Sequence, residues 1–118
     1  MKQLLFLIML FASQVFQAQV YKYNTIKLGE EEQSIKTAVE FEALEEGGVV
    51  VSILTENNTK YIVKVYSYEK EDYTSNEYLF GTDMIRNKEY SVFFSDDRKY
   101  CNLTAMDNIS HTIEFFNE

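Results

Sequence analysis

The feature that most constrains the fold is an alternation of apolar and polar residues with a period of two. Val39 and Phe41 alternate with Glu40 and Glu42, for example. Side chains two positions apart point to the same face of a β-strand, so this period indicates strands that bury one face. β-branched and aromatic residues, which strands favour, are common in these stretches. The sequence therefore predicts an all-β chain, with alternating stretches at residues 35–43, 49–53, 61–65, 90–94, 101–105 and 109–115.

The residues between these stretches predict antiparallel hairpins. The chain has no proline and only four glycines, so glycine, asparagine and aspartate must supply the chain reversals. Pairing Ala43 with Val49 places Gly47 in the loop, where a left-handed backbone suits glycine. Each further hairpin keeps the apolar side chains on one face, as correct register requires. The predicted pairs are Thr55 with Tyr61, Phe94 with Lys99, and Ala105 with Ile109.

These strands predict one antiparallel domain with mostly sequential connections. An opening strand over residues 20–28 and a later one over 78–82 bring the count to seven or eight. We expect a meander that forms a sandwich or a flattened barrel. Residues 29–34 and 69–76 are expected to be polar loops. The predicted core consists of Val39, Phe41, Val51, Ile53, Val63, Val65, Val92, Phe94, Cys101, Leu103, Ile113 and Phe115.

The N-terminal segment has the layout of a secretory signal peptide. Lys2 precedes an apolar run over residues 4–12, and small and polar residues follow as far as Gln19. The run is too short for a membrane span, which needs roughly 20 residues. We therefore expect cleavage near Ala18 or Gln19, a signal peptide over 1–19, and a single β domain over 20–118. The mature protein is expected to be periplasmic or secreted, without a membrane span.

The charge of the chain limits its partners. The formal net charge is −8, and it becomes about −9 once Lys2 is removed. Nucleic acids and anionic membranes select basic surfaces, so neither is an expected partner. Cys101 is the only cysteine. An exported protein with one thiol has no intrachain disulfide partner for it, and we expect Cys101 to be a buried packing residue.

No constellation of residues predicts catalysis or metal binding. His111 is the only histidine, and in the predicted register it lies opposite Leu103 and diagonal to Cys101, on the core side. A nucleophile pair there would lack an orienting acid. One histidine and one cysteine do not supply the ligands of a zinc site, and acidic hairpin tips such as Asp96-Asp97 are ordinary turns. We predict no catalytic residues, no cofactor and no metal.

One stretch resembles a known group of proteins. The aromatic strand Tyr90–Phe94 runs into the acidic turn Asp96-Asp97 and then into Cys101-Asn102-Leu103. This pattern, together with a leader that ends in Ala18-Gln19, resembles small exported proteins of Bacteroidota bacteria. The resemblance implies a small lipocalin-like β-meander. That family has no assigned activity, so the resemblance implies no functional residues.

Two non-enzymatic functions remain open for a domain of this kind. The first is a binding or interaction module, whose contact surface would comprise Ile62, Tyr66 and Tyr68 on one strand face and Tyr73 in the adjacent loop. The second is a lipocalin-like carrier of a small apolar ligand. The sequence favours the module, because large inward side chains such as Phe41, Phe94 and Phe115 should fill a small barrel. A cavity of roughly 300 Å³ or more would favour the carrier.

Overall fold

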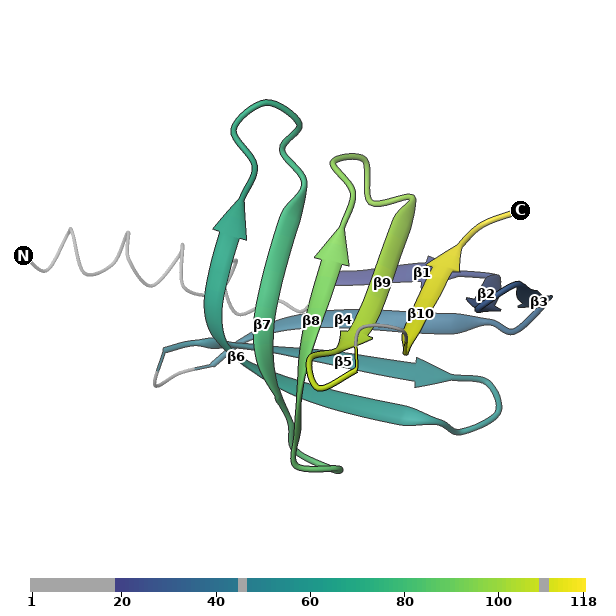
Figure 1. Cartoon of the computed structure of the whole chain (residues 1–118), viewed down its shortest axis with the longest axis horizontal. Helices are drawn as coiled ribbons and strands as arrows, with labels where there is room; N and C mark the ends of the chain where they lie inside the picture. The colour runs from purple at the N-terminus through teal and green to yellow at the C-terminus, as the bar shows by residue number, and fades with distance from the viewer. Residues whose placement is uncertain (1–18, 45–46, 109–110) are drawn as a thin grey trace, which may run out of the picture.

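The computed structural model describes residues 19–44, 47–108 and 111–118, and in these the chain forms an all-β domain with ten strands in one curled sheet (Figure 1). The paired strands are antiparallel, in the order β1-β4-β5-β6-β7-β8-β9-β10-β2-β3. The predicted signal peptide lies almost wholly outside the described residues and stays a prediction. The strands are β1 (Gln19–Tyr23), β2 (Thr25–Leu28), β3 (Glu31–Gln33), β4 (Thr37–Ala43), β5 (Val49–Thr55), β6 (Lys60–Lys70), β7 (Glu77–Asp83), β8 (Lys88–Phe94), β9 (Tyr100–Ala105) and β10 (Thr112–Phe116).

The seven strands from β4 to β10 form the predicted antiparallel meander, because each pairs with the next along the chain. The expected count of seven or eight strands is too low for two reasons. The opening strand is interrupted at Asn24, which divides it into β1 and β2. Residues 31–33, expected to belong to a polar loop, form the short strand β3 beside β2. The architecture is one curled half-barrel sheet, and not two stacked sheets.

The first two strands bring the two ends of the meander together. β1 pairs with β4, β2 pairs with β10, and only Asn24 separates β1 from β2. The backbone N–H of Asn24 donates to the carbonyl of Phe116 at 3.2 Å, and its side chain accepts a hydrogen bond from the N–H of Glu118 at 2.9 Å. A single short segment therefore pairs with both ends of the meander and helps to hold the sheet in its curled form.

The bend of the sheet also depends on β6 and β7. β6 carries a bulge between Val65 and Ser67, and bulges increase local bend and twist. Gly81 of β7 lies opposite Val65, and a Cβ atom placed there would lie only 2.4 Å from the carbonyl oxygen of Lys64. Glycine is the residue that permits this close backbone approach. In Figure 1, β6 first runs beside β5 and then bends to run beside β7.

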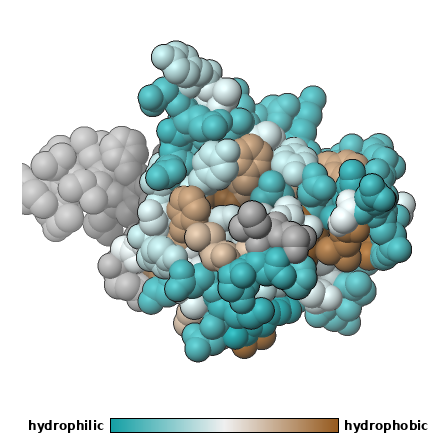
Figure 2. All heavy atoms as spheres, viewed as in Figure 1, coloured by the Kyte–Doolittle hydropathy of each residue, from teal (hydrophilic) through white to brown (hydrophobic). Residues whose placement is uncertain are grey.

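The core lies on the inner face of the curled sheet, and the predicted core is confirmed. Nine of its twelve members are buried, and Phe41, Val65 and Ile113 pack against them as partly buried residues. Figure 2 shows mostly hydrophilic residues on the face of the molecule toward the viewer, with smaller apolar areas among them. The buried predicted residues are Val39, Val51, Ile53, Val63, Val92, Phe94, Cys101, Leu103 and Phe115.

In the observed hairpins the side chains lie on the predicted faces of the strands, but not all of the predicted cross-strand pairs form. The pairing of Ala43 with Val49 is confirmed, and Gly47 has the expected positive φ of 95°. The other three predicted pairs are wrong by two residues. A shift of two preserves the face of every side chain, so the predicted core survives while the loop lengths change. The observed pairs are Ile53 with Tyr61, Phe94 with Cys101, and Leu103 with Ile113.

We predict that Gly81→Ala lowers the free energy of unfolding by about 3 kcal/mol, because the added methyl group meets the backbone of Lys64. The matched control is Thr82→Ala on the outward face of the same strand, which should change stability by less than about 1 kcal/mol. Urea denaturation followed by circular dichroism measures both. Equal stability of the two variants would contradict the close approach.

Candidate functional site

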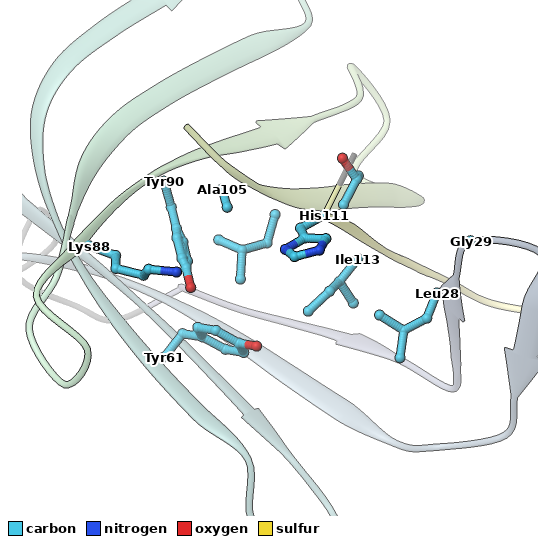
Figure 3. A pocket seen from close by; sticks show the side chains of 10 residues that line it. Leu28, Gly29, Tyr61, Lys88, Tyr90, Ala105, His111 and Ile113 are labelled. Carbon is cyan, nitrogen blue, oxygen red and sulfur yellow. The ribbon is translucent and has the colours of Figure 1, made fainter. Parts of the chain in front are cut away.

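One end of the half-barrel contains a cleft made of two adjoining hollows. Their volumes are about 370 and 250 Å³, and Leu28, Tyr61 and Ile113 line both. Figure 3 shows Tyr61 and Tyr90 on one side of the larger hollow, with His111, Ile113 and Leu28 on the other. The larger hollow is also lined by Gly29, Lys88, Leu103, Ala105 and Thr112. The smaller is also lined by Ile26, Glu31, Gln33, Ile35, Thr55, Asn57, Thr59 and Phe115.

The opposite end of the half-barrel is filled by aromatic side chains. The rings of Tyr21 and Phe41 lie 5.8 and 5.7 Å from that of Phe94. The guanidinium of Arg98 lies 5.4 Å from the same ring and pairs with Glu77. At the cleft end, in contrast, Tyr90 lies opposite the small residue Ala105. The unequal volumes of the inward side chains leave one end packed and the other hollow.

Tyr61 forms a wall of the cleft that is held from two directions. The guanidinium of Arg86 lies 4.0 Å from the centroid of the Tyr61 ring, within the range of a cation–π contact. The ring of Tyr90 packs against it at 5.7 Å. A side chain fixed in this way loses little further freedom when a ligand packs on it, which lowers the entropic cost of binding.

Asp83, fully buried at the end of β7, positions Arg86. Its carboxylate accepts hydrogen bonds from the backbone N–H groups of Ile62, Ile85 and Arg86 at 3.0 to 3.3 Å, and from the Arg86 guanidinium at 2.9 Å. Burial by itself would raise the pKa of Asp83, but these donors outweigh it and hold the pKa below its ordinary value. The ion pair with Asp83 thus holds Arg86 in its contact with the Tyr61 ring.

Polar groups line both hollows, and those of the larger hollow include Lys88 and His111. The ammonium of Lys88 lies 3.5 Å from the carboxylate of Asp107. The ring of His111 lies 3.4 Å from the side-chain nitrogen of Asn108. Burial raises the pKa of both Tyr61 and Tyr90, so their hydroxyl groups stay protonated at neutral pH and can donate hydrogen bonds.

The predicted neighbourhood of His111 and Cys101 is wrong in detail. Cys101 lies opposite Phe115, and His111 lies beyond Ile113, where its carbonyl accepts a hydrogen bond from Ala105. The longer β9–β10 loop moves His111 two residues along the strand, to the cleft. Cys101 is fully buried in the core, as expected, and burial raises the pKa of its thiol. The two side chains therefore belong to different parts of the domain.

The predicted contact surface does not form one patch. Ile62 and Tyr66 point outward, and the Tyr66 hydroxyl donates to Glu89 at 2.8 Å. The bulge turns Tyr68 to the face of Leu79, where it donates to Glu77, so Tyr68 does not share a face with Ile62 as expected. Tyr73 is fully exposed in the turn after β6. That these four residues contact a partner stays a prediction.

Comparisons of the chain with protein-family models, with curated proteins and with solved structures found no match. Among the described residues, no helix has the length and apolar character that would let it cross a membrane.

The sequence did not predict the cleft, although it singled out some of its residues, namely Leu103, Ile113 and Phe115 as core and His111 as the only histidine. Tyr61 and Tyr90 are recognisable as inward positions from the alternation, but the same pattern describes any core residue. Whether their side chains line a hollow depends on the size of the residues that pair with them on the neighbouring strands. Those residues can be identified only when the strand register is known. The pairing of Tyr90 with Ala105 is the one signal that a correct register would have supplied.

We predict that Asp83→Asn lowers stability at neutral pH by about 3 kcal/mol, because Arg86 loses its buried partner. The folded-state pKa of Asp83 lies below the unfolded value. Its contribution is therefore present above the unfolded pKa, near about 3.9, and is lost as the pH falls through the folded pKa. The acid limb of the stability profile should be shallower in Asp83→Asn than in Asp72→Asn, a control in the exposed turn. Parallel acid limbs would contradict this role.

We predict slow labelling of Cys101 by a thiol reagent in native buffer, since the sulfur is buried and its raised pKa disfavours the reactive thiolate. Labelling in denaturant should be faster by roughly 100-fold or more. Rapid native labelling, or a disulfide-linked dimer on a non-reducing gel, would assign Cys101 a role outside packing.

Proposed function

We propose that this protein is a non-enzymatic carrier that binds a small, largely apolar ligand in the cleft at the open end of the half-barrel. The observation that carries the proposal is the pair of adjoining hollows that share Leu28, Tyr61 and Ile113. The larger hollow, about 370 Å³, falls within the usual range of roughly 300–1,000 Å³ for small-molecule sites.

The composition of the cleft supports this proposal. Its walls are mainly aliphatic and aromatic, and burial of apolar ligand surface supplies about 25 cal/mol per Å². The contacts of Arg86 and Tyr90 with the Tyr61 ring give one wall a fixed shape before any ligand binds. Lys88 and His111 are polar groups at the same hollow, which suits a site that orients its ligand.

The interaction-module hypothesis has weaker support. Its four residues are divided between the outer face, the inner face and a turn. Another hollow, of about 440 Å³, involves Leu54 on the outward face of β5, beside Lys22 and Lys36. The proposed ligand site is the cleft, and the hollow beside Leu54 serves as the comparison site.

We predict that the neutral fluorescent probe N-phenylnaphthylamine binds the protein saturably at one site. Leu28→Ser should weaken this binding about tenfold, since Leu28 lines both hollows. Leu54→Ser is the matched control, because Leu28 and Leu54 are 49% and 46% exposed and neither is a core residue. A fluorescence titration measures the dissociation constants.

Three results would overturn the proposal. Absence of saturable binding would exclude an apolar cleft site. Weakening by Leu54→Ser alone would move the site to the outer hollow. Equal weakening by both substitutions would indicate non-specific adsorption to apolar surface.

A further inference from the structure

The larger hollow has a charge pattern that differs from the rest of the chain. The chain carries 19 acidic and 11 basic residues. None of the ten residues that line this hollow is acidic, and they include Lys88 and His111. Lys88 is on the inner face of β8, two residues before the buried Tyr90, and Figure 3 shows its side chain extending toward the Tyr90 ring. The half-exposed Lys88 therefore brings a positive group to an apolar hollow of an acidic protein.

The acidic groups around this hollow leave Lys88 available. Asp83 is buried and is paired with Arg86 at 2.9 Å. Asp107 lies 3.5 Å from the Lys88 ammonium, but the two side chains are 63% and 49% exposed, and ion pairs this exposed contribute little. Glu31 lines the smaller hollow and not the larger one. The cleft thus has a cationic end and an acidic end.

We propose that the ligand of this cleft is an amphipathic monoanion: an apolar body with a single carboxylate or sulfonate group. The anionic group pairs with Lys88 and replaces Asp107 as its partner. The apolar body lies along Tyr61, Leu28 and Ile113 toward the smaller hollow. This inference rests on the proposed function and adds the charge and the orientation of the ligand.

Two fluorescent probes of nearly the same shape test the inference. Anilinonaphthalene sulfonate is the anionic counterpart of the neutral N-phenylnaphthylamine. We expect the wild-type protein to bind the sulfonate about threefold to tenfold more tightly than the neutral probe. Lys88→Met should abolish this preference, so that the variant binds the two probes with about equal affinity. Asp107→Asn should strengthen binding of the sulfonate, because it removes the competing carboxylate.

Lys64→Met is the control for adsorption of the sulfonate to surface lysines, since Lys64 is exposed on the outward face of β6. It should leave the preference intact. Equal affinities for the two probes, or a preference that Lys88→Met leaves unchanged, would overturn the inference while the proposed function stands. Failure of both probes to bind would overturn the proposed function itself.

Discussion

The pairing of the N-terminal segment with both ends of the meander is the interaction on which the rest of the structure depends. Seven sequential strands alone would form an open sheet with two unpaired edges, which invite association with other chains. β1 covers the edge of β4, and β2 covers the edge of β10. The break at Asn24 allows one short segment to do both. Because β1 and β2 are consecutive in the chain, they hold the two ends of the meander near each other, and the apolar side chains of the inner face form the core.

The two openings of the half-barrel are filled unequally, because the inward side chains at the two ends differ in volume. The Tyr21, Phe41 and Phe94 rings fill one opening, and Arg98 lies over them. Ala105, opposite Tyr90, leaves the other hollow. Close packing at one end stabilises the fold, so the other end need not be filled to the same density. The functional proposal is based on this difference: one end of the half-barrel is closely packed, and the other end contains a cleft.

The sequence predicted which face of its strand each side chain lies on better than it predicted which residues pair across neighbouring strands. A period of two determines which side chains point inward, and this was sufficient for the strands and the core. Loop length is set by backbone conformations that the period does not encode. The positive φ angles of Asn58 and Arg98, at 70° and 63°, belong to turns that shift the β5–β6 and β8–β9 pairs by two residues.

The candidate site was less predictable, because it depends on these same details. The β6 bulge, which has no signal in the alternation, separates Tyr68 from Ile62 and Tyr66. His111 reaches the cleft only because the β9–β10 loop is longer than expected. A hollow is defined by what lies across from each residue, so an error of two in the register hides it while leaving the core prediction correct.

One end of the half-barrel is packed with aromatic side chains, and we propose that the other end binds a ligand. The most direct measurement is a methyl NMR titration with anilinonaphthalene sulfonate. We expect the signals of Leu28, Ile35 and Ile113, which line the cleft, to shift together with one dissociation constant, while those of Ile62 and Leu54 on the outer face do not shift. Shifts confined to Ile62 or Leu54, with the cleft signals unchanged, would contradict it.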